Sequence, residues 1–161
     1  MKNTVLRLIN WFDEGLARGE TIALITIVVV MTGIVLLQVL YRYVFAQPLH
    51  WSEELARYLF VWLSILGATL ALQKKGHFGL DIFYQMLPKK GRRFGQFFIY
   101  LLLGIVIWVI FFQGIILVQK TVLQESPAMG ISMSWVYASL PVGGALMAVH
   151  LLVLFFKDIK K

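Results

Sequence analysis

The sequence predicts an all-α integral membrane protein whose four transmembrane helices form one domain over residues 1–161. Hydrophobic residues make up 60% of the chain and charged residues 14%, whereas soluble domains carry about 25% charged residues. Four apolar runs each reach the roughly 20 residues that a helix needs to cross a bilayer. We expect helices because a helix satisfies its own backbone hydrogen bonds in lipid.

In chain order, the predicted helices cover about residues 21–44, 52–73, 94–119 and 133–156. The first run follows Asp13, Glu14, Arg18 and Glu20 and is longer than the apolar core of a signal peptide. We therefore expect it to remain in the mature chain. Pro141 is expected to kink the fourth helix near its start.

Two further segments, residues 4–18 and 78–87, have apolar residues at helical spacing beside polar neighbours. This pattern is typical of short amphipathic helices that lie in the membrane interface. The alternative is that each segment extends a neighbouring transmembrane helix into the headgroup region. The pattern is compatible with both.

The distribution of basic residues predicts that both chain ends are cytoplasmic, because cytoplasmic loops carry an excess of Lys and Arg. Six of the 15 basic residues lie between Lys74 and Arg93, and the C-terminal tail is also basic. Residues 45–51 contain no Lys or Arg, and residues 120–132 contain only Lys120. The net charge of +7 thus fits a topology signal better than a nucleic-acid groove. We expect the lipid bilayer, and no nucleic acid, as a partner.

The interiors of the predicted helices contain almost no Asp, Glu, Lys, Arg or His. Ion-coupled carriers usually place such residues at mid-membrane, where they hold ions or charged solutes. His150, toward the cytoplasmic end of the fourth helix, is the exception. The sequence therefore favours a helper or scaffold protein over a small autonomous exporter.

Four charged residues are expected to cluster at the outer face, where the first two helices meet: Arg42, Glu53, Glu54 and Arg57. Residues three or four apart on a helix are neighbours, so either glutamate can reach Arg57. One interpretation is a docking or substrate-contact site. The other, which a neutral cluster favours, is an ion-paired clamp between two helices. Adjacent glutamates point about 100° apart on a helix, so paired acid–base catalysis is not expected.

The histidines leave open an alternative function, a haem-bearing membrane anchor of an electron-transfer enzyme. His77 and His150 should both lie near the inner edge, whereas His50 should lie at the outer edge. His77 follows Lys75 and Gly76 in a position suited to hydration, which weakens this pair as haem ligands. Cysteine is absent, which excludes disulfides and cysteine-ligated clusters. We expect no cofactor and no catalytic site.

Small residues four apart predict close helix contacts at Gly67 and Ala71 in the second helix, and at Gly144 and Ala148 in the fourth. Such pairs let another backbone approach closely. The pattern also arises by chance in apolar sequence, so it does not identify the neighbouring helix.

Several motifs together resemble the small membrane subunit of tripartite ATP-independent periplasmic (TRAP) transporters, of the DctQ/SiaQ type. They are the runs Tyr41–Phe45, Trp51–Tyr58, Leu66–Ala68, His77–Asp81 and Gly130–Ser132, followed by Trp135, Tyr137, Pro141 and Gly143. The resemblance covers nearly the whole chain. Its most distinctive part is the Trp-x-Glu-Glu-x-x-Arg element that begins at Trp51.

The resemblance implies a non-catalytic scaffold subunit of a sodium-coupled transporter in the bacterial inner membrane. In this family a large multi-spanning membrane subunit carries the substrate, and a periplasmic binding protein delivers it. The solutes are mainly organic acids, such as C4-dicarboxylates and sialic acid. Arg42, Glu53, Glu54 and Arg57 match the family's charged element, and His77 and Asp81 match its cytoplasmic loop element.

Overall fold

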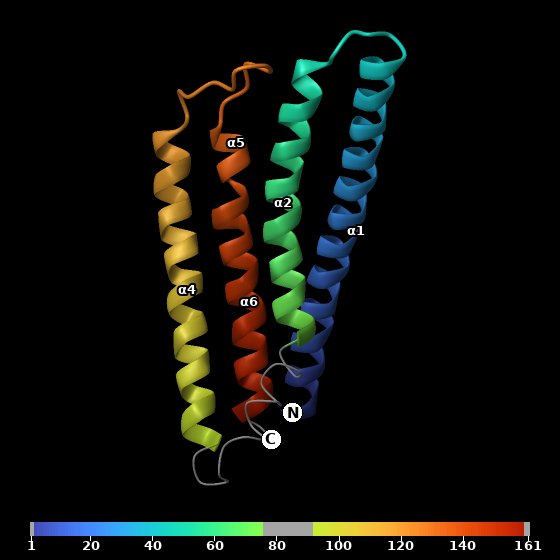
Figure 1. Cartoon of the computed structure of the whole chain (residues 1–161). Coiled ribbons are helices and arrows are strands. Elements are labelled where there is room, and N and C mark those ends of the chain that lie inside the picture. Colours follow the sequence, from blue (N-terminus) through green and yellow to red (C-terminus); the bar gives the residue numbers. More distant parts are fainter. Residues whose placement is uncertain (1, 76–91, 160–161) are drawn as a thin grey trace.

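The computed structural model describes residues 2–75 and 92–159, and this part of the chain is almost entirely helical (Figure 1). The helices are α1 (Lys2–Tyr43), α2 (His50–Lys75), α4 (Arg92–Lys120), α5 (Ser134–Tyr137) and α6 (Ser139–Ile159). Within the described ranges, β-structure is limited to an isolated antiparallel bridge between Glu125 and Ser132. The predicted all-α fold class is confirmed.

Four helical stretches are long and apolar enough to cross a membrane: Trp11–Tyr43, His50–Lys74, Phe97–Lys120 and Ser134–Lys157. They coincide with the four predicted spans, except that the first begins ten residues earlier than expected. The direction in which they cross the bilayer remains a prediction.

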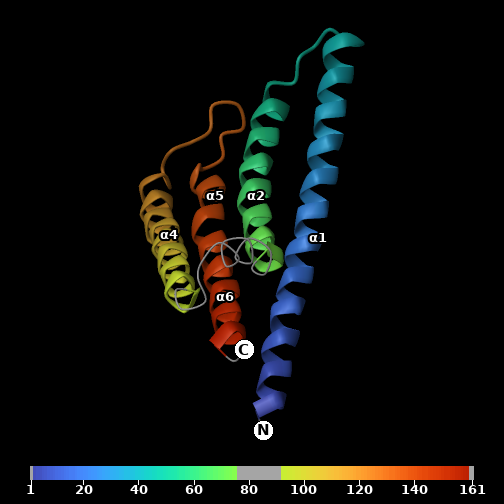
Figure 2. The ribbon, with the colours of Figure 1, turned by 60° about the horizontal axis from the view of Figure 1, so that its bottom comes forward.

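The early start has a structural reason, because α1 is one unbroken helix that includes residues 4–18. This segment extends the first span and does not form a separate interfacial helix. At 1.5 Å per residue, α1 is about 60 Å long, twice the hydrocarbon thickness of a bilayer. Figure 2 shows it running obliquely past the other helices. The second proposed amphipathic segment, residues 78–87, lies outside the described residues.

The fourth span is divided between α5 and α6, and Ala138 lies between them. Pro141 explains the irregularity, because it has no N–H to donate to the carbonyl oxygen of Tyr137 one turn earlier. Proline is well tolerated in the first turn of a helix, which is where it lies in α6.

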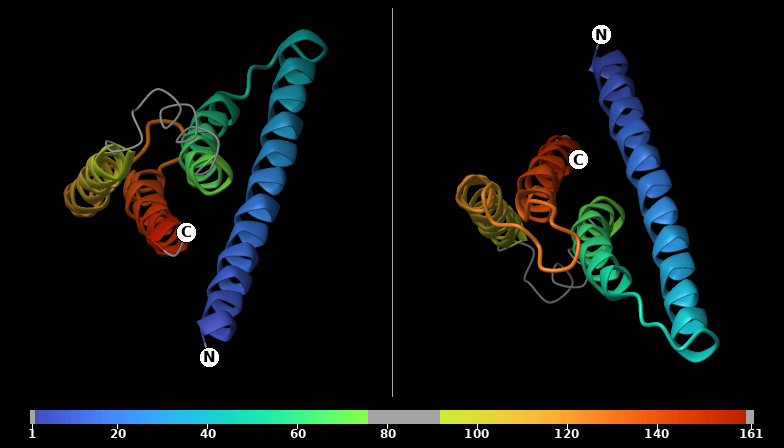
Figure 3. Two further views of the ribbon diagram at one scale, coloured as in Figure 1. Left: turned by 90° about the horizontal axis from the view of Figure 1, so that it is seen from below. Right: turned by 90° about the horizontal axis from the view of Figure 1, so that it is seen from above.

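The helices are arranged in the order α4, α6, α2, α1 (Figure 3). α6 packs against both α4 and α2, while α1 packs mainly on α2 and touches α6 less. Both chain termini lie at one end of the bundle, which we call the termini end. Residues 44–49 and 121–133 connect helices at the opposite end, which we call the loop end.

Glycines allow α6 to approach both of its neighbours. A Cβ added at Gly143 would overlap with Cγ2 of Ile65 on α2. A Cβ at Gly144 would lie 3.1 Å from the backbone N of Phe111 on α4. A Cβ at Gly114 on α4 would lie 2.9 Å from the backbone N of Pro141. Glycine at these three positions therefore lets the helix backbones come close together.

The outer surface of the bundle is apolar, as expected for contact with lipid. α1 is the most exposed helix, since none of its most apolar stretch is buried within the chain. Large apolar side chains such as Ile22, Val29 and Leu36 are 60% exposed or more. Lipid or a partner protein must cover this face.

Candidate functional site

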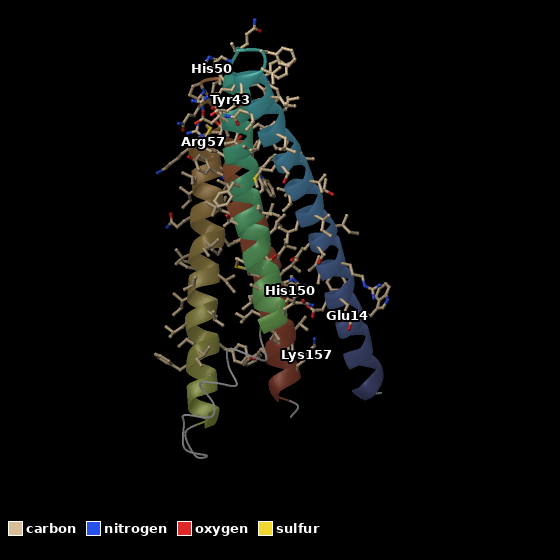
Figure 4. The ribbon with its side chains drawn as sticks, turned by 45° about the vertical axis from the view of Figure 1, so that its right-hand side comes forward. Glu14, Tyr43, His50, Arg57, His150 and Lys157 are labelled. Carbon is tan, nitrogen blue, oxygen red and sulfur yellow. The ribbon has the colours of Figure 1, made fainter. Side chains whose placement is uncertain are left out.

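A buried polar cluster joins three helices near the termini end (Figure 4). At its centre is the fully buried imidazole of His150 on α6. Its Nδ1 lies 2.7 Å from Oδ1 of Asp13, and its Nε2 lies 2.9 Å from Oε1 of Glu20, both on α1. Both carboxylates are about 95% buried. We call these three residues the His150 triad.

Two further side chains bind the outer oxygens of the triad. Nζ of Lys157 on α6 lies 3.4 Å from Oδ2 of Asp13. The hydroxyl of Thr69 on α2 donates to Oε2 of Glu20 at 2.5 Å, and it also lies 2.7 Å from the carbonyl oxygen of Leu66. Every carboxylate oxygen of Asp13 and Glu20 therefore has a polar partner.

Helical spacing places the members of this cluster on facing sides of α1 and α6. Asp13 and Glu20 are seven residues apart, so they lie two turns apart on one face, with the buried Ala17 between them. His150 and Lys157 have the same spacing on α6. Because the spacing is the same on α1 and α6, Asp13 meets both His150 and Lys157, and Glu20 meets His150.

The cluster has the chemistry of an interhelical clamp and not of a reactive site. Its ring nitrogens bind the inner carboxylate oxygens, and the outer oxygens bind Lys157 and Thr69, which leaves none of them turned toward a substrate. Among the described residues, no group of three or more His, Cys, Asp or Glu side chains is arranged to hold a metal ion.

The same geometry removes the support for the haem alternative. An axial histidine must present a nitrogen lone pair to the iron. Both ring nitrogens of His150 instead face carboxylates. His50 is exposed at the loop end, far from His150 (Figure 4), and His77 lies outside the described residues.

A second polar arrangement lies at the loop end, around the buried carboxylate of Glu54 on α2. The hydroxyl of Tyr58, one turn further along α2, donates to Oε1. The backbone N–H groups of Ala128 and Met129 donate to Oε2 at 2.9 and 3.0 Å. Glu54 thereby ties the connection between α4 and α5 to α2.

The connecting loop is shaped for this contact by its own backbone. The N–H of Ser126 donates to the carbonyl of Ile131 at 2.8 Å, and the N–H of Met133 donates to that of Gln124 at 2.8 Å. Gly130 closes the tip with a φ of +63°, a conformation that glycine adopts at little cost. Two successive N–H groups at the tip then converge on one carboxylate oxygen.

The other predicted charged residues do not pair with Glu54. Arg42, Glu53 and Arg57 are exposed, and no ion pair among the described residues involves them. The guanidinium of Arg42 instead lies 5.9 Å from the ring centroid of Tyr43. The expected Arg–Glu pairing is thus absent within this chain. One reason is that α1 diverges from α2 toward the loop end (Figure 2).

The predicted small-residue positions differ in their surroundings. Gly144 is buried against Phe111, and Ala148 is half-buried. A Cβ at Gly67 would meet nothing within 4 Å, and Ala71 is exposed. The loop residues His77 and Asp81 lie outside the described residues.

Sequence reasoning missed the partners of His150, namely Asp13, Glu20, Thr69 and Lys157. The sequence did indicate that His150 has partners, because a histidine inside an apolar span needs a polar group to bind. Asp13 and Glu20, seven residues apart before the first span, were candidates. The pattern left open whether residues 4–18 extend the first span, and that extension is what brings Asp13 next to α6.

A family model described as "Tripartite ATP-independent periplasmic transporters, DctQ component" matches residues 31–161 of the chain. The sialic acid TRAP transporter small permease protein SiaQ of Vibrio cholerae is 31% identical over 147 residues. That match covers 88% of this chain and 82% of SiaQ.

Longer proteins also contain a similar stretch. The sialic acid TRAP transporter permease protein SiaT of Haemophilus influenzae is 37% identical over 122 residues, which are 76% of this chain but 20% of SiaT. The isethionate TRAP transporter permease protein DctMQ of Oleidesulfovibrio alaskensis is 29% identical over 155 residues, 90% of this chain and 24% of DctMQ. The chain therefore spans about a fifth to a quarter of these two relatives.

Proposed function

The chain belongs to the DctQ component family of TRAP transporters, and on this basis we propose that it is the non-catalytic scaffold subunit of a sodium-coupled organic-acid importer. It is a multi-pass protein of the bacterial inner membrane. Its proposed partners are a large membrane subunit, which carries the substrate, and a periplasmic binding protein, which delivers it.

The observation that carries the scaffold role is the way its ionisable groups are used. The interior of the fourth span contains a single residue of the types Asp, Glu, Lys, Arg and His, namely His150. Its side chain is fully buried, and both ring nitrogens face carboxylates. Residues 21–41, 58–73 and 97–119, which form the interiors of the other three spans, contain no Asp, Glu, Lys, Arg or His on which an ion or organic acid could be carried. His150 and its carboxylate partners bind α6 to α1.

The similarity to SiaT and DctMQ supports association with a large subunit. In each of those proteins, a stretch like this chain forms part of a much longer permease. The apolar face of α1, which the chain itself does not bury, offers enough surface for such a partner as well as for lipid.

We further propose that the loop end faces the periplasm. α2 ends at Lys75, α4 begins at Arg92 and the last turn of α6 carries Lys157, and these helix ends lie at the termini end, which is the expected cytoplasmic side. The loop held by Glu54 would then be presented to the binding protein, together with the exposed Glu53 and Arg57. Attaching a reporter that is active only in the periplasm to either chain end or to residues 121–133 tests this orientation.

The substrate proposal rests on the relatives. Their printed names give sialic acid, isethionate and C4-dicarboxylates, which are all organic acids. If the binding protein and the large subunit select the solute, a small subunit of this kind can serve transporters for any of these organic acids.

The function is tested by purifying the tagged chain from its native membranes in mild detergent and identifying what accompanies it. We expect a stoichiometric, many-spanning membrane protein. The purified proteins are then reconstituted in vesicles with the binding protein and labelled sialic acid or C4-dicarboxylates. Uptake should need an inward sodium gradient and should fall to background when this chain is omitted.

Each part of the proposal has its own contrary outcome. Full uptake by the large subunit and binding protein alone would exclude a required scaffold. Uptake or efflux by this chain alone would instead indicate an autonomous carrier. Uptake that persists without a sodium gradient would exclude sodium coupling and leave the scaffold role intact.

A further inference from the structure

We propose that the His150 triad is a buried proton-binding site, in which His150 is held as an imidazolium between Asp13 and Glu20, and that this proton keeps α1 attached to α6. The proposal concerns the chain itself and does not depend on the transported solute.

Counting the hydrogen-bond donors leads to this conclusion. A neutral imidazole has one N–H donor and one nitrogen lone pair. In the triad, however, both ring nitrogens lie within 2.9 Å of a carboxylate oxygen, and the two carboxylates belong to different residues. Two nitrogen–oxygen contacts need two protons, whichever tautomer the ring adopts. The site must therefore hold one proton more than a neutral imidazole beside two carboxylates.

The surroundings place that proton on the ring. Oδ2 of Asp13 faces the ammonium group of Lys157, and Oε2 of Glu20 accepts from the hydroxyl of Thr69. Carboxylate oxygens that each receive a donor are best satisfied when the group is ionised. With an imidazolium, Asp13, Glu20, His150 and Lys157 also sum to zero charge, which makes burial tolerable.

Among the residues whose side chains the structure describes, Lys157 is the only other charged group in contact with the triad. On α1, Glu14 and Arg18 are exposed. α2 contributes only the neutral hydroxyl of Thr69, and its next basic residue, Lys74, is exposed. On α4, Tyr100 is the one side chain of an ionisable type between Arg93 and Lys120, and its ring packs against Phe155.

The proton has a structural consequence for α1. This helix packs mainly on α2 and touches α6 only in part, and the triad supplies two hydrogen bonds between α1 and α6. Without the proton, one buried carboxylate would face a nitrogen lone pair, and the repulsion would act directly across this contact. The attachment of α1 to α6 therefore depends on the positive charge of the protonated His150, which belongs to α6.

The test is to observe the ring of His150 by nitrogen NMR in the full chain reconstituted in lipid. Exchanging the other two histidines, His50→Gln and His77→Gln, leaves His150 as the only labelled histidine. At about pH 7.5 an imidazole in water is mostly neutral, since histidine loses its proton near pH 6.5. We expect both ring nitrogens of His150 to carry protons at this pH. A ring with one unprotonated nitrogen would overturn the proposal.

A second variant tests whether the carboxylates are the cause. Asp13→Asn and Glu20→Gln, added to the same background, keep the side-chain shapes and remove both charges. We expect the ring to become neutral at about pH 7.5. A ring that remained doubly protonated would show that the carboxylates do not hold the proton, which would also overturn the proposal. If this variant fails to fold, the first measurement decides alone.

Discussion

Buried carboxylates are accommodated differently at the two ends of this bundle. At the loop end, Glu54 accepts from Tyr58 on its own helix and from two backbone N–H groups. At the termini end, Asp13 and Glu20 share a single imidazole from another helix. Backbone N–H donors survive every substitution except one by proline, whereas the imidazole is lost when one residue changes. The termini end should therefore be much more sensitive to a single change.

The largest effect is expected from His150→Ala. The substitution removes the shared partner and leaves two carboxylates buried, with one of them bound only to Thr69. Breaking a buried charge pair costs about 3–5 kcal/mol, so we expect a loss of that size in the free energy of unfolding. Unfolding in mixed lipid–detergent micelles measures it.

His50→Ala is the matched control, because this histidine is exposed at the start of α2. Its effect should stay within about 0.5 kcal/mol, as for most surface positions. Equal losses for the two variants would mean that the termini end is not the more sensitive one.

A second prediction tests whether close packing near the loop end rivals the charges at the termini end. In Gly114→Ala, the added methyl group would meet Cβ of Leu140 at 2.8 Å and the backbone of Pro141 at 2.9 Å. Backbone cannot move aside as a side-chain tip can. We expect unfolding to become easier by about 1–3 kcal/mol, the usual cost of overpacking.

Gly104→Ala on the same helix provides the control, since a Cβ there would meet nothing within 4 Å. Alanine is the better helix former by up to about 1 kcal/mol, so this variant should be neutral or slightly more stable. Destabilisation of both variants to the same degree would indicate that the α4–α6 contact is not responsible.

The contrast between the ends also explains what the sequence revealed. The four spans could be predicted because apolar length is a local property that lipid makes decisive. Glu54 could be singled out because its neighbours on the helix are charged. Its partner Tyr58 lies one turn away on the same helix, whereas Ala128 and Met129 use only backbone atoms, which carry no sequence signal. The His150 triad joins residues 130 and more positions apart, and local spacing does not show which helices meet.

A smaller effect is expected from Thr69→Val, which removes the hydroxyl that donates to Glu20 but keeps the side-chain shape. One oxygen of a buried carboxylate would lose the one donor that the described residues give it. We expect a loss of about 1–2 kcal/mol in unfolding free energy, because hydrogen bonds to charged groups are worth more than neutral ones. Thr26→Val is the control, since its hydroxyl is exposed and bonds only the carbonyl of Ile22. A larger loss at Thr26 than at Thr69 would contradict this ranking.

The smallest effect on global stability is expected from Glu54→Gln, because the amide keeps one acceptor oxygen and Tyr58 can still bind it. The loss should be local. Hydrogen exchange at the N–H groups of Ala128 and Met129 should rise several-fold, since an amide whose oxygen binds Tyr58 turns its NH2 group, which is a donor, toward these two N–H groups. The neighbouring Glu53→Gln should leave both rates unchanged, because that side chain is exposed. If the two variants exchange alike at these positions, the carboxylate of Glu54 does not hold the loop, and the backbone bonds of residues 124–133 must shape it unaided.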